Sequence, residues 1–504
     1  MRLNMQRKSG VLLPITALMS EYGIGDFGQS AYSFIDFIVG MGFSVWQILP
    51  ITILGAGNSP YSGTSAFAGN FLLIDPESIP DKFLSHEEKN SFKYNGSPYK
   101  VDYEFARTKK YDLLNLAFSR LDEEYKEKIS EFSKENTYWL DDYALFMAIS
   151  EIKGYNFLKW NNGYKFRRVD PMRKANIEFE NRINYYKFEQ YLFYIQWENL
   201  KKVARERGVT IFGDMPIYVS LQSADVWANP KMFELDANLN PKRVAGVPPD
   251  YFSEDGQLWG NPLYSYKKME KDNFKWWASR IKHNLKLYDM VRIDHFRGLY
   301  KYWAIPQASN SAKTGEWVVG PQYKIWDAIK GEIDNLNIVA EDLGIIDDDV
   351  RKYLSDLGFP GMRVFQFAFD GKRENPHLPY NYNKNVVAYT ATHDNNTTLG
   401  WLYYLDQATR EQVLLYLESE NSEWGAGGGM SPAVQTAVKD IIASAANMAI
   451  IPFQDLCGYG ADTRINIPGT PTGNWEFRTT FAAFDEINTA YILRINRLYG
   501  RTDR

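Results

Sequence analysis

Short apolar runs recur along the chain, and each ends in polar residues before a stretch of helical periodicity begins. Buried parallel strands show such continuous apolar runs. The stretch 274–287 is typical of the helical segments, because Trp277, Ile281 and Leu285 fall on one face. The runs lie at 11–13, 44–49, 209–213, 290–294, 337–341, 362–367, 386–392 and 448–453. Eight alternating strand and helix units predict an α/β fold, a (β/α)8 TIM barrel.

The spacing of these runs is uneven and predicts large insertions in the barrel loops. Roughly 160 residues separate the second run from the third. We interpret 52–207 as a mostly helical insertion subdomain, with helices near 124–132 and 184–206, and 395–447 as a second loop insertion. The glycines at 425–429 follow no strand and precede no phosphate-loop lysine, so they indicate a flexible loop. We expect residues 1–504 to form a single catalytic barrel without a C-terminal β-domain.

Composition narrows the class of protein. The chain is 45% hydrophobic and 24% charged with a net charge of -5, which is ordinary for a globular protein and argues against nucleic acid as a partner. Aromatic residues make up 15%, and they fit either a large core or faces that stack on sugar rings. Because Cys457 is the only cysteine, no internal disulfide is possible, and we expect a small buried residue in a cytoplasmic protein.

The N-terminal residues superficially resemble a secretion signal. Arg7 and Lys8 precede an apolar run at 11–19, but Pro14 and Thr16 interrupt it. We therefore expect this segment to be part of the fold. No apolar run reaches the roughly 20 residues that a membrane span needs, so no membrane partner is expected.

Carboxylates collect where the predicted strands end, which is where barrel enzymes carry their active sites. Like charges at one mouth are costly for a fold, so the ring of polar residues suggests function. We expect Asp342 and Asp455 to be helix N-caps instead. The polar residues at the strand ends are Asp214, Arg292, Asp294, Glu341, Asp342, Asp370, His393, Asp394, Gln454 and Asp455.

Strand alternation separates the roles of these acids. Arg292 and Asp294 share one strand face, and the arginine favours an ionised carboxylate, as a glycosidase nucleophile requires. Glu341, if it faces the mouth, can donate a proton, with a pKa raised by burial and by nearby negative charge. Two carboxylates on neighbouring strands can lie about 5 Å apart, the geometry of a retaining glycosidase. Asp394, beside His393, could hold sugar hydroxyls and favour a distorted ring.

Metal chemistry is not favoured, because the sequence has no EF-hand loop and no pair of histidines at metal-binding spacing.

Ten segments resemble glycoside hydrolase family 77, the 4-α-glucanotransferases or amylomaltases of the α-amylase clan. Their order and spacing make this resemblance specific. The segments are YGIGDFG at 22–28, NSPYS at 58–62, GDMPIYV at 213–219, VPPDYFS at 247–253, GQLWGNP at 256–262, VRIDHFRG at 291–298, AEDLG at 340–344, PGMR at 360–363, THDN at 392–395 and RINIPGT at 464–470.

The resemblance implies a role for each matching residue. Asp294 corresponds to the nucleophile, Glu341 to the acid/base and Asp394 to the transition-state stabiliser. The implied sugar contacts are Arg292 and His393 at the cleavage subsite, the third-strand Asp214, the stacking residue Tyr61, and Ser59, Trp259, Asp370 and Asn466. Residues 245–262 correspond to a lid over the acceptor side. Ala391, Ile465, Cys457 and Phe477 depart from the family pattern, at positions that are not catalytic.

The resemblance implies a 4-α-glucanotransferase that moves α-1,4-glucan segments between malto-oligosaccharides through a glycosyl ester on Asp294. Amylose and glycogen-type glucans are the implied larger substrates, no cofactor is implied, and monomer and homodimer both stay open. The α-1,4 linkage rests on the resemblance alone. Two alternatives are an α-glucan hydrolase of the same clan and an inactive glucan-binding protein. The inactive protein would be expected to lack Asp294, Glu341 or Asp394, and all three are present.

Overall fold

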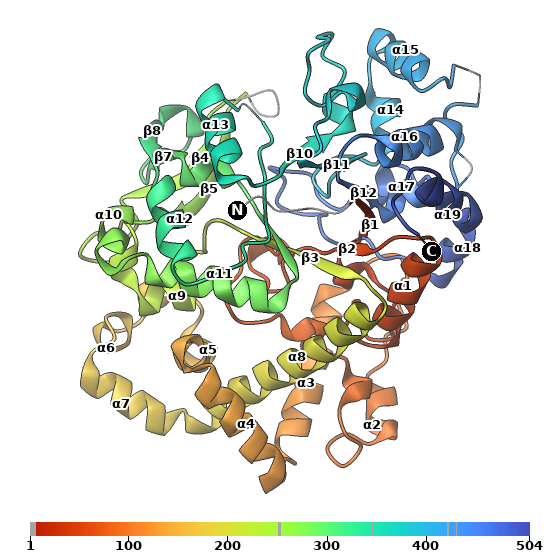
Figure 1. Ribbon diagram of the computed structural model, residues 1–504. Coiled ribbons are helices and arrows are strands. Elements are labelled where there is room, and N and C mark those ends of the chain that lie inside the picture. Colours follow the sequence, from red (N-terminus) through yellow and green to blue (C-terminus); the bar gives the residue numbers. More distant parts are fainter. Residues whose placement is uncertain (1–6, 250–253, 345, 421–422, 430, 504) are drawn as a thin grey trace.

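The predicted barrel is confirmed by a computed structural model, which describes residues 7–249, 254–344, 346–420, 423–429 and 431–503 (Figure 1). All eight predicted strands form, within a few residues of the expected bounds. They are β1 (Lys8–Leu12), β2 (Val45–Gln47), β3 (Thr210–Met215), β6 (Met290–Ile293), β9 (Ile338–Ala340), β10 (Gly361–Val364), β11 (Val386–Tyr389) and β12 (Met448–Pro452).

The eight strands form one parallel sheet in the order β10-β11-β12-β1-β2-β3-β6-β9. The seam between β9 and β10 is closed by the Ala340 amide, which donates to the Pro360 carbonyl at 2.9 Å. Asp342 reinforces the seam by accepting from the Met362 amide at 2.6 Å and from Arg363 at 3.1 Å. The prediction that Asp342 is an N-cap was therefore wrong: Asp347 caps the following helix, α13 (Asp348–Leu357).

Alternation along the strands divides the apolar residues between two layers. Phe212, Met290 and Val339 belong to a cluster that fills the barrel interior. Ile211, Val291 and Ala340 belong to the larger core beneath the surrounding helices. Since Val291 and Ile293 both face the helices, the intervening Arg292 points inward, as the alternation predicted.

Helices surround the strands and form the remaining connections. Helix α11 (Lys275–Leu287) occupies the predicted helical stretch and buries Trp277 and Ile281. The other α-helices outside the connection between β2 and β3 are α1 (Gln29–Gly40), α9 (Ala224–Ala228), α10 (Tyr266–Met269), α12 (Tyr323–Lys330), α13 (Asp348–Leu357), α14 (Thr398–Tyr404), α15 (Gln407–Tyr416), α16 (Pro432–Ala443), α17 (Phe453–Cys457), α18 (Phe481–Glu486) and α19 (Thr489–Leu498). The described chain thus ends in two helices.

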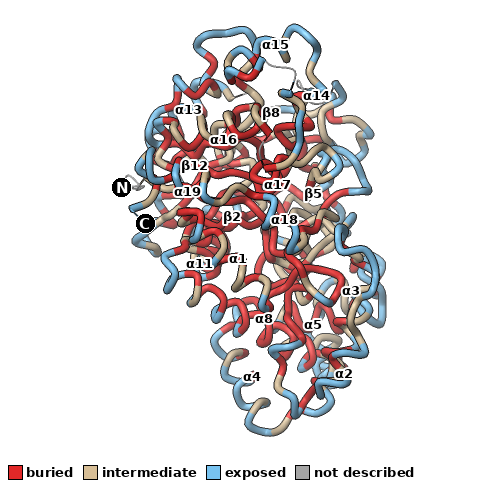
Figure 2. Tube along the Cα trace, turned by 90° about the vertical axis from the view of Figure 1, so that its right-hand side faces the viewer, coloured by how far each residue is buried: buried red, intermediate tan, exposed pale blue. Residues whose placement is uncertain are grey.

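Between β2 and β3 the chain forms a set of helices that pack on one side of the barrel (Figure 1). They are α2 (His86–Ser91), α3 (Tyr103–Phe118), α4 (Glu123–Glu135), α5 (Thr137–Lys153), α6 (Asn162–Lys165), α7 (Val169–Glu178) and α8 (Glu180–Glu206). Figure 2 shows the chain buried along α5 and α8 and exposed over much of α4 and α15. Glu189, at the centre of α8, is a buried carboxyl.

A second sheet was not anticipated from the sequence. Four antiparallel strands lie in the order β5-β4-β7-β8. Their bounds are β4 (Arg243–Val247), β5 (Gln257–Pro262), β7 (Lys301–Pro306) and β8 (Glu316–Val319). Leu258 and Trp259 on β5 are partly exposed, and polar residues and a glycine flank them, so this strand lacks the continuous apolar run by which we identified the barrel strands.

Asp455 is not an N-cap of its own helix either, because α17 begins after Pro452. Its buried carboxylate instead accepts from the Thr390 hydroxyl at 2.5 Å and from the Thr398 amide and hydroxyl at 2.7 Å each. It thereby holds both ends of the loop 390–398, which carries His393 and Asp394. Over the described ranges, no helix is both long and apolar enough to cross a membrane.

Candidate active site

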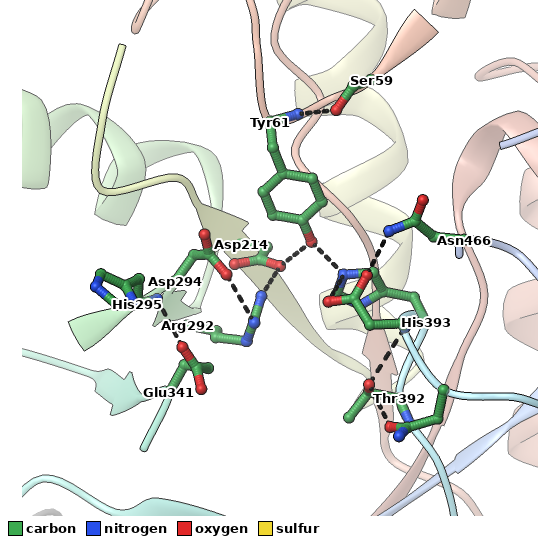
Figure 3. A network of polar contacts seen from close by, with 12 residues as sticks. Ser59, Tyr61, Asp214, Arg292, Asp294, His295, Glu341, Thr392, His393 and Asn466 are labelled. Atoms are coloured by element: carbon green, nitrogen blue, oxygen red, sulfur yellow. Dashed lines mark hydrogen bonds and ion pairs between the residues drawn. The ribbon is translucent and has the colours of Figure 1, made fainter. Parts of the chain in front are cut away.

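Neighbouring parallel strands bring Asp294 and Glu341 to one edge of the barrel. Register pairs Ile293 with Ala340, so the next residues, Asp294 and Glu341, lie side by side. The Glu341 amide donates to the Ile293 carbonyl at 3.1 Å, which continues the pairing past the strand ends. Parallel strands are about 4.8 Å apart, a spacing compatible with two carboxylates that act on one bond. Figure 3 shows both acids beside Arg292.

Arg292 links two of the predicted acids. Its Nη2 donates to Asp294 Oδ1 at 2.9 Å, and its Nη1 donates to Asp214 Oδ2. The side chains of Arg292 and Asp214 are only 4% and 0% exposed, whereas that of Asp294 is 28% exposed. Arg292 and Asp214 are therefore held in place beneath the site, and Asp294 is the residue of the three that a ligand can reach.

Backbone amides orient Glu341. Its Oε2 accepts from the His295 amide at 2.8 Å, and its Oε1 accepts from the Leu343 amide at 2.7 Å. His295 has a positive φ of 47°, so the chain turns sharply after Asp294 and aims this amide at the neighbouring strand end. The carboxyl group of Glu341 is thus held by one backbone amide from the turn after β6 and by another from the segment that follows β9.

Tyr61 links His393, the neighbour of Asp394, to the group around Arg292. Its hydroxyl donates to Asp214 Oδ2 at 2.7 Å and lies 2.8 Å from His393 Nε2 (Figure 3). The rings of Tyr61 and His393 are stacked, with centroids 5.4 Å apart. His393 Nε2 is 3.3 Å from Asp394 Oδ2, and Asn466 donates to Asp394 Oδ1 at 2.6 Å. Polar contacts therefore connect residues from five distant segments in one network.

Burial dominates the charge states of the paired acids. It raises the pKa of Asp294 to about 8, and Arg292 opposes this shift without overcoming it. Burial also raises the pKa of Glu341, against Arg292 and the two backbone amides. The sequence predicted the Glu341 shift and the direction in which Arg292 acts on Asp294, but not that burial would outweigh the arginine. Two such carboxyls share a proton near neutral pH. Since Arg292 contacts Asp294 directly, we assign the negative charge to Asp294 and the proton to Glu341.

The histidines in the network are neutral near pH 7. Burial lowers the pKa of His393, and Asp394 only partly offsets this effect. Burial also lowers the pKa of His295 to about 3, with a further contribution from Arg297. Burial lowers the pKa of Arg292 as well, but the charges of Asp214 and Asp294 outweigh it and raise that pKa. The arginine is therefore the permanent cation of the site.

The remaining predicted contacts lie at different distances from this network. The Ser59 hydroxyl accepts from the Tyr61 amide at 3.2 Å and so supports the stacked ring. Trp259 is 36% exposed and packs edge-on against His295, with ring centroids 4.9 Å apart. Asp370 is exposed and accepts from the Lys372 amide at 3.1 Å. Among the described residues, no hydrogen bond joins Asp370 to the network.

Three positioning residues were missing from the predicted set. The amides of His295 and Leu343 hold Glu341, and Arg464 donates to the Asp394 carbonyl at 2.6 Å. All three lie in or beside the matched segments VRIDHFRG, AEDLG and RINIPGT, so the segments contained the signal. No cluster of three or more potential metal ligands occurs in the described parts of the chain.

The fold and the paired acids place this chain among the (β/α)8 enzymes that act on glycosidic bonds. The 4-α-glucanotransferase family profile matches residues 13–483. The 4-α-glucanotransferase of Aquifex aeolicus (strain VF5) is 43% identical over 94% of this chain and 95% of its own length. The one of Clostridium butyricum is 40% identical over 97% and 100%.

Among solved structures, the amylomaltase of Streptococcus agalactiae in complex with acarbose superposes with a TM-score of 0.94. It is 36% identical and covers 99% of this chain and 100% of its own. The chain belongs to the 4-α-glucanotransferase family. The family resemblance and the enzyme class predicted from the sequence, a glucan-transferring enzyme, are thereby confirmed.

Proposed function

We propose that this enzyme transfers α-1,4-glucan segments between malto-oligosaccharides by a retaining double displacement through a glycosyl ester on Asp294. Amylose and glycogen-type glucans are the proposed longer donors and acceptors. The observation that carries the proposal is the side-by-side placement of Asp294 and Glu341, with Arg292 hydrogen-bonded to Asp294 and not to Glu341. The single, buried Cys457 is compatible with a reducing compartment, and we propose a cytoplasmic location.

In the first half-reaction, Glu341 gives its proton to the glycosidic oxygen while Asp294 Oδ2 attacks the anomeric carbon. This oxygen is the one that Arg292 does not engage. The bond to the leaving sugar breaks, the leaving sugar takes the proton, and an ester forms on Asp294. In the second half-reaction, ionised Glu341 removes a proton from an incoming 4-hydroxyl, whose oxygen attacks the ester. Two inversions retain the configuration.

Asp394 is the proposed stabiliser of the oxocarbenium-like transition state. Asn466 and His393 fix its two carboxylate oxygens in place, and the Arg464 contact holds its backbone. A carboxylate that is held before the reaction does not have to reorganise as positive charge develops on the sugar ring. The Tyr61 ring, which is partly exposed and stacked on His393, offers an apolar face to that sugar.

We propose that residues 245–262 cover the acceptor side, although positions 250–253 lie outside the described residues. Trp259 contacts His295, whose amide binds Glu341. Val247 and Pro248 line a cavity of about 250 Å³ together with His295 and Leu343. An acceptor sugar bound there would lie next to the acid/base and would exclude water. Transfer would then prevail over hydrolysis.

Incubation with maltotriose distinguishes transfer from hydrolysis. Transfer yields glucose together with a ladder of longer oligosaccharides, and chromatography resolves both. If only glucose and maltose appear, the enzyme is a hydrolase and the proposed function is wrong.

Trapping of the intermediate tests the role of Asp294. A maltosyl fluoride donor needs no acid for its leaving group, so Glu341→Gln should form the ester while the base for its removal is missing. Mass spectrometry of the digested protein should find a maltosyl increment on the peptide that contains Asp294. In the matched control, Glu341→Gln with Asp294→Asn, the increment should be absent. Label on another residue would overturn the assignment.

A further inference from the structure

A cavity of about 600 Å³ lies away from the acids of the barrel mouth, where α6, α9 and α10 meet (Figure 1). None of the acids Asp214, Asp294, Glu341 and Asp394 lines it. Its walls come from the insertion at 165–167, from 227–232, and from Leu239, Lys268, Met269 and Asp272. The cavity is thus built by residues that the proposed reaction does not use.

The charge of the cavity wall is opposite to that of the protein. The whole chain carries a net charge of -5, but Lys165, Arg167, Lys231 and Lys268 line the cavity with Asp272 as the single acid. In the described parts of the chain, no salt bridge pairs Lys165, Lys231 or Lys268. Three lysines that line one concave space create a positive potential there, which attracts an anion.

Arg167 also lines this wall and is held by two contacts. It forms an ion pair with Asp142 at 2.5 Å, and its guanidinium lies 4.2 Å from the centroid of the Trp227 ring. Its Nη1 is buried without a hydrogen-bond partner among the described residues. One further acid, Asp236, lies near Lys165 but outside the wall. The Asn240 amide chiefly lowers the pKa of Asp236, with a small contribution from Lys165. The lysines therefore determine the positive charge of the cavity wall.

Apolar groups complete the cavity. Met232, Leu239 and Met269 line it, and Phe166 presents a ring that is 36% exposed. Lys165 Nζ lies 5.5 Å from the centroid of this ring. An aromatic face beside cations suits a ligand that combines a sugar ring with a phosphate group, since sugars stack on aromatic faces and lysines bind phosphate.

We propose that this cavity is a binding site for a phosphorylated sugar, with the phosphate held by Lys165, Lys231 and Lys268 and the sugar ring placed against Phe166. The phosphate is carried either by a free hexose phosphate or by a phosphorylated unit of a glucan. A sugar phosphate carries close to two negative charges at pH 7, which matches the excess of cations. The site does not depend on the proposed transfer reaction.

Isothermal titration with glucose 6-phosphate tests the site in the wild-type protein, without any glucan. We expect a dissociation constant below about 1 mM at low salt that rises with added NaCl, because exposed charges are screened. Lys231→Gln and Lys268→Gln should each weaken binding by about fivefold or more, as loss of a charge-assisted hydrogen bond does. Lys231→Arg should retain binding.

The matched control is Lys267→Gln, which removes the exposed lysine next to Lys268 that does not line the cavity. Its affinity for glucose 6-phosphate should equal that of the wild type. Inorganic phosphate should bind more weakly than glucose 6-phosphate, and unmodified maltotriose should not compete. If a phosphorylated malto-oligosaccharide binds more tightly than glucose 6-phosphate, the site binds a phosphorylated unit of a glucan and not a free hexose phosphate.

Three results would overturn the proposal. The first is no heat of binding at a glucose 6-phosphate concentration ten times the expected dissociation constant. The others are equal affinity for glucose 6-phosphate in the wild type and in the Lys231 and Lys268 variants, or displacement of glucose 6-phosphate by maltotriose. Transfer from maltotriose should be unchanged in these variants. If the sugar-phosphate site is wrong, the proposed transfer reaction is unaffected. If the transfer reaction is wrong, the sugar-phosphate site is unaffected.

Discussion

Asp294→Asn tests the electrostatics of the acid pair and the proposed chemistry together. Asparagine has nearly the volume of aspartate and keeps an oxygen that can accept from Arg292, but it cannot ionise. Burial raises the pKa of Asp294 to about 8 in the folded protein, whereas an unfolded chain has a value of about 3.9. Between these values the folded pair of Asp294 and Glu341 holds a proton that the unfolded chain releases. This carboxyl therefore reduces the free energy of unfolding as pH rises.

The size of the effect follows from the two pKa values. At about 1.4 kcal/mol per pH unit, the destabilisation is at most about 4 kcal/mol at pH 7 and about 1.5 kcal/mol at pH 5. Because Asp294 is 28% exposed and shares its proton with Glu341, the actual effect is smaller. We expect Asp294→Asn to raise the free energy of unfolding by about 1–3 kcal/mol at pH 7 and by less than about 1 kcal/mol at pH 5.

Urea unfolding of the wild type and the variant at both pH values measures this gain, and glucose release from maltotriose measures activity. Activity should fall about 10⁴-fold or more, on the scale of removed nucleophiles. The control Asp370→Asn changes an exposed acid and should alter stability by less than about 0.5 kcal/mol. If Asp294→Asn is no more stable than the wild type at pH 7, burial does not raise the pKa of this carboxyl and the reasoning is wrong. An active variant would refute its role as nucleophile.

Three further predictions follow from the described contacts. Tyr61→Phe removes the hydroxyl shared by Asp214 and His393, and kcat/KM for maltotriose should fall about 10- to 100-fold, that is about 1.4–2.7 kcal/mol. Asp455→Ala leaves Thr390 and Thr398 without their buried acceptor and should reduce stability in urea by about 3 kcal/mol. Burial raises the pKa of Glu189 to about 8, so stability is lost as pH rises towards that value. Thermal unfolding should therefore show Glu189→Gln gaining stability over the wild type at pH 9 but not at pH 4.

Each of these predictions has a result that contradicts it. Unchanged kcat/KM in Tyr61→Phe would mean that the hydroxyl does not position His393 for the reaction. If Asp455→Asn, which retains an acceptor oxygen, were as unstable as Asp455→Ala, the hydrogen bonds would not be the cause. A pH-independent effect of Glu189→Gln would mean that the carboxyl does not titrate in the core.

Much of the fold is determined locally, and the sequence therefore predicted it. The run Val291, Arg292, Ile293 alternates between the two faces of a strand, and the structure places the apolar pair in the outer core and Arg292 inside. Eight such segments separated by helical stretches admit few arrangements other than a barrel. The ten matched segments identified the family for the same reason, since each lies within a short stretch of chain.

Other features depend on contacts between distant segments, which periodicity does not contain. Asp342 and Asp455 resemble N-caps in the sequence, but tertiary neighbours make them the acceptors that reinforce the barrel seam and hold the loop 390–398. The sequence showed that Arg292 favours ionised Asp294, but not that burial outweighs the arginine, because burial is a property of the whole fold. The sequence by itself thus determined the barrel, the family and the acids at its mouth. Only the tertiary structure decided how those acids share charge and which residues hold them, since both depend on groups brought together across hundreds of residues.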